Sequence, residues 1–223
     1  MNTLTQLDNL LIGSQNAVET LAEKTHARVL VISDSHGAYE EFSLILERFG
    51  NTCDALFFCG DGSLDLIKLL QNFHSDPEKN KYLPSVVAIV RGNGDSSSYP
   101  IEVNLTPDRF SIPDNQTVTV NGKRIFITHG HKEYIDYSFE DLGLKLQLQQ
   151  CDFACYGHTH ISADDRDDNF RFINPGSISR PRGSSPFSFA ILTVEKTFID
   201  CAFLEIKKGF GNQRDYKIYT PLS

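Results

Sequence analysis

Residues 28–36 read Arg28-Val29-Leu30-Val31-Ile32-Ser33-Asp34-Ser35-His36. A short, continuous apolar run of this kind is typical of a strand buried on both faces, as in a parallel sheet. The run ends in a carboxylate and an imidazole, Asp34 and His36. Residues 39–49 then space their apolar side chains as a helix does. The stretch therefore predicts the first strand and helix of an α/β fold, with polar groups where the strand ends.

The same order repeats twice further along the chain. Residues 55–59 predict a second strand, which ends at Gly60-Asp61, and residues 63–73 a second helix. Residues 86–90 predict a third strand, followed by Gly92-Asn93-Gly94-Asp95. Strand, helix, strand, helix, strand is the pattern of a parallel βαβ sheet.

Antiparallel structure is expected after residue 116. Asn121-Gly122, a dipeptide suited to a type I′ hairpin turn, separates strand-like segments at 117–120 and 124–128. Beyond the hairpin, the pattern predicts a helix at 139–148, a strand at 153–156, and a strand meander over 170–173, 187–194 and 197–206, with an irregular tail after Lys207.

The first 26 residues form a predicted helical extension. Apolar residues from Leu4 to Leu21 have roughly helical spacing, interrupted by Gly13. We therefore divide the chain into an extension, residues 1–26, and one domain, residues 27–223. Within that domain Ser96-Ser97-Ser98 and residues 179–186 are expected to form loops over the site, because Ser, Gly and Pro favour turns.

Composition limits the classes of function. The net charge of −8 argues against extended nucleic-acid binding, which uses basic surfaces. No apolar run approaches the ~20 residues that span a bilayer. The N-terminal segment carries acidic residues instead of a basic start followed by an apolar stretch, which predicts no signal peptide. Together with an odd number of cysteines, five, this predicts a cytoplasmic protein.

Some histidines and cysteines are better interpreted as structural or surface residues than as functional ones. Cys151 and Cys155 could form half of a zinc site, but no second pair has matching spacing, so buried packing is favoured. No motif surrounds His26 or His74, and we interpret both as structural or surface residues.

Five clusters place acidic, imidazole or amide groups at expected strand ends. They are Asp34-Ser35-His36, Gly60-Asp61, Gly92-Asn93-Gly94-Asp95, His129-Gly130-His131 and Gly157-His158-Thr159-His160. Strands of one sheet can bring such distant segments together at its carboxyl edge. Seven side chains could then hold two divalent ions: Asp34, His36, Asp61, Asn93, His129, His158 and His160. Asp61 can bridge the ions, since a carboxylate has two oxygens.

The nature of these donors narrows the metal and the chemistry. Nitrogen and oxygen donors without thiolate favour Mn, Fe, Zn, Ni or Co. Two such ions would lower the pKa of a shared water and provide a hydroxide nucleophile without a covalent protein intermediate. We expect Mn first, with Ni, Fe, Zn, Co or Mg as alternatives.

The five clusters, in this order, resemble the motifs of the calcineurin-like metallophosphoesterase superfamily. The segment Asn174-Pro175-Gly176-Ser177, followed by Ser179-Arg180-Pro181-Arg182-Gly183, resembles its YfcE-type small phosphodiesterase branch. The resemblance extends from about Val29 to Ile206. It implies a four-layer α/β/β/α sandwich of two mixed sheets.

The resemblance also implies a role for each ligand. It assigns Asp34, His36 and His160 to the first metal, Asn93, His129 and His158 to the second, and Asp61 to both. The chain departs from the broader family at Gly94, where many members have a histidine that protonates the leaving group and the YfcE branch commonly has a cysteine. We expect His131 to substitute as the proton donor, so the predicted catalytic residues are Asp61, Asn93 and His131.

Two arginines and one aspartate complete the predicted site. Arg180 and Arg182 could bind substrate phosphate, because guanidinium pairs with phosphate oxygens; surface charge on a loop is the alternative. Asp95 is expected to support His131 or a histidine ligand as an outer partner that does not itself bind the metal.

These residues predict a metal-dependent phosphodiesterase acting on a small phosphodiester by attack of a metal-bound hydroxide. A phosphomonoesterase, a nucleotide or dinucleoside polyphosphate hydrolase, and a nuclease are alternatives on the same site. A non-catalytic interaction scaffold is an alternative of another class, which the complete ligand set disfavours. The N-terminal extension could also serve partner binding or homo-oligomerisation.

Overall fold

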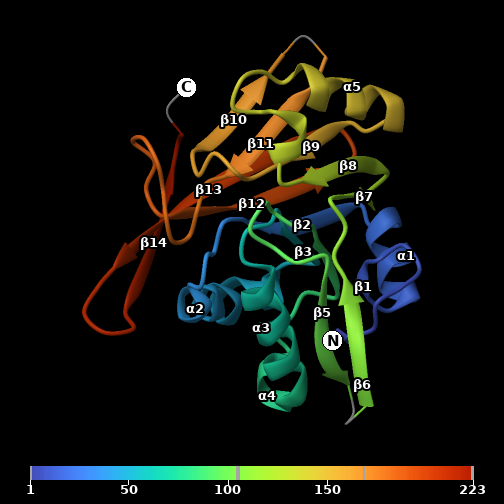
Figure 1. Cartoon of the computed structure of the whole chain (residues 1–223), viewed down its shortest axis with the longest axis vertical. Helices are drawn as coiled ribbons and strands as arrows, with labels where there is room; N and C mark the ends of the chain where they lie inside the picture. Colours follow the sequence, from blue (N-terminus) through green and yellow to red (C-terminus); the bar gives the residue numbers. More distant parts are fainter. Residues whose placement is uncertain (1, 104–105, 168, 222–223) are drawn as a thin grey trace.

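Two mixed sheets lie face to face in the computed structural model, which describes residues 2–103, 106–167 and 169–221 (Figure 1). Met1 and residues 222–223, which the predicted domain bounds include, lie outside the described residues. The larger sheet has the order β1-β4-β3-β2-β12-β13-β14, with the bounds Ile12–Gly13, Val86–Ile89, Ala55–Phe58, His26–Ile32, Ser188–Glu195, Ile199–Lys208 and Arg214–Tyr219. The smaller sheet has the order β10-β11-β9-β8-β7, with the bounds Ser162–Arg166, Arg171–Pro175, Phe153–Cys155, Lys123–Thr128 and Asn115–Val120.

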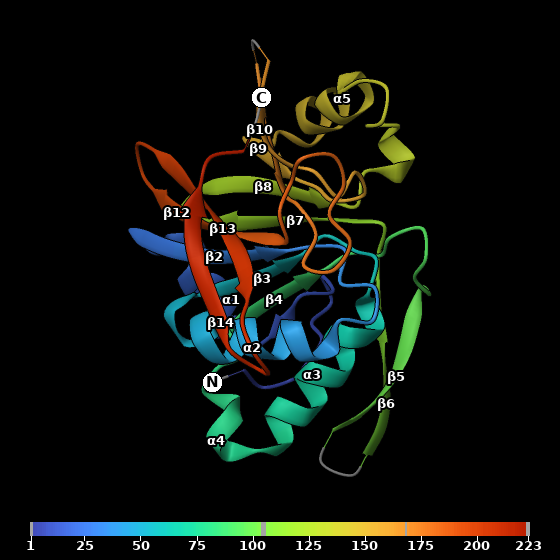
Figure 2. The same cartoon turned by 90° about the vertical axis from the view of Figure 1, so that its left-hand side faces the viewer.

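Helices cover the outer face of each sheet, as Figure 2 shows with the layers edge-on. The larger sheet is covered by α2 (Tyr39–Phe49) and α3 (Ser63–Ser75), with the short α4 (Pro77–Asn80) after α3. The smaller sheet is covered by α5 (Glu140–Gln149). The predicted four-layer sandwich is therefore confirmed. Within the described ranges, none of these helices has the length and apolar character needed to cross a membrane.

Alternating side chains on each strand explain the layers. On β2, Leu30 and Ile32 face the core beneath α2 and α3, whereas Val29 and Val31 face the core between the sheets. On β8, Ile127 lies between the sheets and Phe126 packs in the α5 core. Because successive side chains of a strand point to opposite faces, each buried strand supplies two cores at once.

The N-terminal helix is shorter than its apolar spacing suggested. It is α1 (Gln15–Glu23), capped by the Ser14 hydroxyl, which accepts from the amide of Ala17. Residues 2–14 are not helical, and β1 pairs with β4 as the edge of the larger sheet. Leu4 and Ile12 are buried in the core beneath α2 and α3. Their apolar spacing therefore reflects burial of a segment that is not helical. The domain division at residue 26 stays a prediction.

The predicted irregular tail is wrong, because β14 adds a strand to the sheet edge. Its sequence is mostly polar, so its pattern on its own was weak. Tertiary contacts hold it in place: Arg214 donates from Nε to both carboxylate oxygens of Glu41 on α2, at 2.8 and 3.0 Å. The predicted meander is likewise corrected, since β11 joins the smaller sheet, whereas β12 and β13 continue the larger one.

Three further strands have no counterpart in the prediction. Besides β10, these are β5 (Ser98–Val103) and β6 (Thr106–Ser111), which form a separate two-stranded sheet. Prolines at 100 and 107 concealed the latter two, because proline cannot donate to a ladder and argues against a strand. The predicted hairpin is confirmed: β7 and β8 meet at Asn121 and Gly122, both with positive φ.

Candidate metal centre

The site lies where β2, β3 and β4 end beside the ends of β8 and β9. The first three strands run parallel in one sheet and the last two run parallel in the other. The amide of Asp34 donates to the carbonyl of Gly60, and the amide of Gly157 donates to the carbonyl of His129. The residues after neighbouring strands are thus joined directly, and the five predicted clusters meet at one edge of the sandwich.

The first group of candidate metal ligands consists of Asp34, His36 and His160. Nε2 of His160 is 3.1 Å from Oδ1 of Asp34 and 3.1 Å from Nε2 of His36. Nε2 of His36 is 3.7 Å from the same Asp34 oxygen. Atoms bound to one ion at ~2.1 Å have separations of about 3 Å, so these three groups fit a single ion.

A second group consists of Asp34, Asp61 and His129, so Asp34 belongs to both groups. Nε2 of His129 is 3.5 Å from Oδ2 of Asp61, and Nε2 of His36 is 3.8 Å from that same oxygen. The Asp61 carboxylate therefore lies between imidazoles of the two groups.

Asn93 and His158 form a pair beside the second group. Oδ1 of Asn93 is 3.1 Å from Nδ1 of His158. The ring centroids of His158 and His129 are 5.1 Å apart. The structure thus brings together all seven residues predicted as ligands.

Unsatisfied polar atoms support a cation at this place. Oδ1 of Asp34 and Nε2 of His129 are buried, and neither makes a hydrogen bond within the described part of the chain. Buried polar atoms normally have partners, because leaving them unpaired costs ~1–3 kcal/mol each. A divalent ion would satisfy both atoms, so the residues present fit a metal.

The ionisation of the site is dominated by close acid–base contacts. Burial raises the pKa of Asp34, but the nearby imidazoles of His160 and His36 outweigh it and lower the pKa well below its ordinary value. Burial lowers the pKa of His129, but the Asp61 carboxylate and the charge of Asp34 outweigh it and raise the pKa. The carboxylates therefore stay ionised, as metal ligands must.

Backbone strain is concentrated at the ligands. Asp34, His36, Asp61, His158 and His160 have φ values of 55°, 42°, 56°, 70° and 59°. Residues other than glycine rarely adopt this left-handed backbone conformation. Those that do cluster at functional sites, where the surrounding structure holds them.

Two motif glycines permit close approach of the ligands. A Cβ at Gly92 would lie 2.0 Å from Oδ1 of Asp61, and a Cβ at Gly157 would lie 2.0 Å from the Ser33 hydroxyl and 2.9 Å from Oδ2 of Asp34. Any side chain at either position would displace a ligand. Gly94 is less restricted: its amide donates to Oδ1 of Asp61 at 2.8 Å, and a Cβ there would be 3.3 Å from that oxygen.

In the part of the chain that the structure describes, Asp95 hydrogen-bonds to no histidine, which corrects the predicted contact. Its carboxylate accepts from the backbone amides of Asp61, Gly62, Ser63 and Gly92 at 2.8 to 3.0 Å. It also accepts from the Ser63 hydroxyl at 2.8 Å. Asp95 therefore shapes the loop that carries Asp61.

The segment at 174–180 has a supporting role that its sequence did not reveal. Asn174 donates to the carbonyl of Gly157 at 2.8 Å, and the hydroxyls of Ser177 and Ser179 donate to the carbonyl of Asp34 at 2.7 and 3.0 Å. These side chains fasten the loop after β9 to the loop after β2.

The predicted proton donor and phosphate contacts lie next to the ligand loops. The ring centroid of His131 is 5.4 Å from that of His129, and Nδ1 of His131 has no hydrogen-bond partner among the described residues. Arg180 and Arg182 are exposed, in the predicted loop. Their backbones contact His160: the Arg180 carbonyl lies 2.5 Å from Nδ1, and the Arg182 amide donates to the His160 carbonyl.

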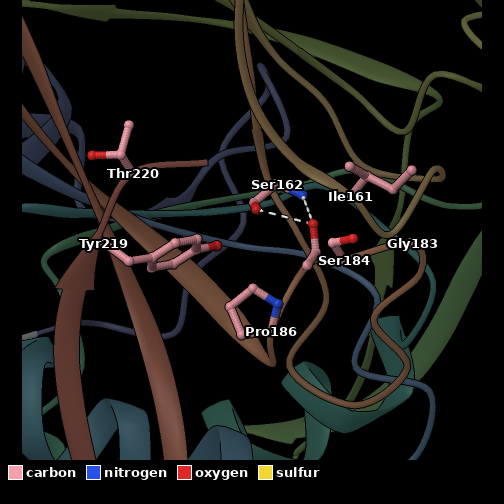
Figure 3. A pocket seen from close by; sticks show the side chains of 8 residues that line it. Ile161, Ser162, Gly183, Ser184, Pro186, Tyr219 and Thr220 are labelled. Carbon is pink, nitrogen blue, oxygen red and sulfur yellow. Dashed lines mark hydrogen bonds between the residues drawn. The ribbon is translucent and has the colours of Figure 1, made fainter. Parts of the chain in front are cut away.

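A separate pocket of about 210 Å³ lies between β10, β14 and the segment at 183–186 (Figure 3). The Tyr219 ring lines one side, and Ile161 and Gly183 lie across from it. None of the described residues lining this pocket is a predicted metal ligand. The chemistry is therefore assigned to the metal centre.

Comparison with known proteins agrees with this geometry. The calcineurin-like phosphoesterase superfamily domain matches residues 28–197. The chain is 30% identical to the probable metallophosphoesterase YsnB of Bacillus subtilis, over 83% of this chain and 93% of the relative. It is 32% identical to phosphodiesterase YfcE of Escherichia coli K12, over 74% of this chain and 86% of the relative.

A solved structure shares the fold at low sequence identity. Vacuolar Protein Sorting 29 from Cryptosporidium parvum has a TM-score of 0.65 and 17% identity, covering 88% of this chain and 98% of that one. The family match extends over most of the chain and includes every segment that supplies a candidate ligand. The chain therefore belongs to the calcineurin-like phosphoesterase superfamily.

Proposed function

We propose that this protein is a dinuclear metal-dependent phosphodiesterase that hydrolyses a small phosphodiester. The observation that carries the proposal is the pair of ligand groups that share Asp34 and have Asp61 between their imidazoles. Two ions in such an arrangement can clamp a displacement at phosphorus. The name of the relative YfcE, a phosphodiesterase, supports the choice of a diester.

Each ligand has a stated role in the proposal. Asp34, His36 and His160 would hold one ion, Asn93, His129 and His158 the other, and Asp61 would contact both. When bound, two divalent ions supply Lewis acidity and lower the pKa of a water molecule towards neutrality. Burial raises the pKa values of the Asp34 and Asp61 carboxyl groups, but neighbouring imidazoles outweigh it and lower them. Both groups are therefore ionised in the metal-free protein, as metal binding requires.

His131 is the proposed proton donor to the leaving group, and Arg180 and Arg182 the proposed phosphate contacts. Burial, followed by the charges of His129 and His158, lowers the pKa of His131. The lowered pKa favours the neutral ring, so a smaller fraction of the protein carries the proton that this role requires. With Gly94 in place of an imidazole, the site favours esters whose leaving groups need little protonation.

We infer that Mn²⁺ is the working metal and that the protein acts in the cytoplasm. Ligation by imidazole nitrogen and carboxylate or amide oxygen suits Mn²⁺, and cellular availability selects among Ni, Fe, Zn, Co and Mg as alternatives. All five cysteines are free thiols in the structure, and four of them are buried. A reducing compartment would keep them in this state.

Two other functions remain to be separated by experiment. A monoesterase or nucleotide hydrolase would use the same ligands, and a monoesterase would depend more on leaving-group protonation. A protein-interaction scaffold is suggested by the fold shared with Vacuolar Protein Sorting 29. The convergence of all seven candidate ligands favours an enzyme over a scaffold.

A substrate panel tests the proposal. The protein is stripped with chelator, reloaded separately with Mn²⁺, Ni²⁺, Zn²⁺ or Mg²⁺, and assayed on bis(p-nitrophenyl) phosphate, p-nitrophenyl phosphate, cyclic nucleotides and short single strands. We expect two bound ions per chain and faster turnover of the diester than of the monoester. Monoester turnover that exceeds diester turnover with every metal would overturn the substrate class, and failure to bind any of these ions would overturn the enzyme.

A further inference from the structure

The imidazole of His158 lies between two oxygen atoms. Its Nδ1 faces Oδ1 of Asn93 at 3.1 Å, and its Nε2 lies 2.9 Å from Oδ2 of Asp136. Asp136 belongs to none of the five motif clusters, and its spacing in the sequence gave no indication of this contact. We propose that Asp136 is a positioning residue, which fixes the ring orientation and tautomer of His158 so that Nδ1 is free to bind the second metal.

The inference rests on the proposed function and follows from the chemistry of imidazole. A neutral imidazole carries one proton, and a carboxylate accepts only from a protonated nitrogen. The Asp136 contact therefore places the proton on Nε2, which leaves the lone pair on Nδ1, beside the Asn93 oxygen. A carboxylate behind a histidine ligand also raises the basicity of the ring, and its loss typically costs ~10–100-fold in metal affinity.

The fold brings Asp136 to this position through a shaped loop. Gly130 and Tyr134 have φ values of 107° and 50°, which turn the chain sharply after β8. Ile135 is buried and packs over Gly130 so closely that a Cβ there would lie 2.3 Å from its Cδ1. Because its neighbour Ile135 is anchored, Asp136 is directed at His158 by the loop.

The contact should matter for metal binding more than for folding. The side chain of Asp136 is 49% exposed and that of His158 is 21% exposed. Exposed ion pairs contribute ~0–1 kcal/mol to stability. A large change in metal affinity with little change in unfolding would therefore indicate positioning instead of structural support.

Two variants and one control test the inference. Asp136→Ala removes the acceptor, and Asp136→Asn keeps an accepting oxygen without the charge. Glu140→Gln removes an equal charge from an exposed residue at the start of α5. Mn²⁺ affinity and stoichiometry are measured by calorimetry with chelator competition, and urea unfolding of the metal-free proteins checks the fold.

We expect Asp136→Ala to lower the affinity for the second Mn²⁺ ion by ~10–100-fold and Asp136→Asn to lower it less. Glu140→Gln should bind both ions with wild-type affinity. Wild-type affinity for both ions in Asp136→Ala would overturn the inference. A wild type that binds fewer than two ions would instead overturn the proposed function.

Nitrogen NMR of the metal-free protein separates these two failures. We expect His158 of the wild type to carry its proton on Nε2, and to populate both tautomers in Asp136→Ala. The same tautomer population in both proteins would overturn the positioning role regardless of metal uptake.

Discussion

The carboxylates and the imidazoles of the metal centre are fixed by opposite kinds of hydrogen bond. The carboxylates receive donors: Oδ2 of Asp34 accepts from the Ser33 hydroxyl and the His158 amide, and Oδ1 of Asp61 accepts from the Gly94 amide. The imidazoles face acceptors: Nδ1 of His129 is 2.7 Å from the Cys59 carbonyl. In both cases the partner contacts one polar atom of the side chain, and a second polar atom faces the neighbouring ligands.

The imidazoles differ among themselves in how firmly their partners are fixed. The carbonyls of Cys59 and Arg180 orient His129 and His160, and a substitution cannot remove a carbonyl. His158 depends instead on a half-exposed side chain, Asp136. The difference indicates that, of these three histidines, His158 is the one whose orientation a point mutation can most easily disturb.

Each half of the site has a carboxylate that supports it and is not a predicted ligand. The carboxylate half is the loop that carries Asp61, and the imidazole half is the loop that follows Thr128 and carries His129. Asp95 gathers the amides of the Asp61 loop. Glu133 is 2% exposed, accepts from the Thr128 hydroxyl at 2.9 Å and pairs with Lys145 on α5. Replacing these residues tests whether the two halves depend equally on their support.

The largest effect is expected at Asp61, which lies between both ligand groups. Asp61→Ala should reduce turnover by more than ~10³-fold, since that is the upper range for removing one preorganised electrostatic group. Metal content per chain, measured by elemental analysis, should fall, while circular dichroism stays that of the wild type. Retained activity with two ions bound would show that Asp61 does not bridge.

Asp95→Ala should have the next largest effect, because it leaves backbone amides around Asp61 without their acceptor. Hydrogen bonds to a charged group contribute ~1.5–3 kcal/mol each, and water will replace some of them. We expect the free energy of unfolding in urea to fall by about 3 kcal/mol, and Mn²⁺ affinity to fall with it. Asp200→Ala, at an exposed site on β13, is the control. Equal stability of the two variants would refute the supporting role.

Glu133→Gln tests the corresponding support in the imidazole half. The substitution removes the charge that pairs with Lys145 but retains an acceptor for Thr128. We expect a loss of about 1–2 kcal/mol in the free energy of unfolding, since Lys145 is 34% exposed and water can solvate it. Two Mn²⁺ ions should still bind at saturating concentration. A larger loss than that of Asp95→Ala would reverse the proposed ranking of the halves.

The smallest effect is expected at Asp114, which links the two halves. Asp114 forms ion pairs with Arg91, which follows β4, and with Lys132, which follows His131. The hydrogen bond from Arg91 is the main reason that the pKa of Asp114 is lowered. A lowered pKa contributes stability that is present above the unfolded-state value of ~3.9 and is lost as pH falls through the folded-state value.

Asp114→Asn should therefore cost ~0.5 kcal/mol at pH 7, and the cost should shrink as pH falls below the unfolded-state value, as measured by urea unfolding at a series of pH values. Asp200→Asn serves as the control for removal of an exposed charge. A cost for Asp114→Asn that grows as pH falls would contradict this explanation.

Much of the fold was predictable where burial is strong and periodic. The helix at 39–49 matches α2, and the first three parallel strands lie within a residue or two of their predicted places. Prediction failed where tertiary contacts override a weak pattern. Leu4 and Ile12 are buried without being helical, and β14 is held by Arg214 and Glu41 across the chain.

The sequence by itself determined which groups could bind metal, because residue type and the predicted strand ends are enough to identify carboxylate and imidazole side chains there. Only the tertiary structure decided what orients them. The carbonyls of Cys59 and Arg180 belong to the backbone and have no sequence signature, and Asp136 reaches His158 through a turn that its neighbours impose. Chemical identity is local, whereas orientation depends on contacts between segments far apart in the chain.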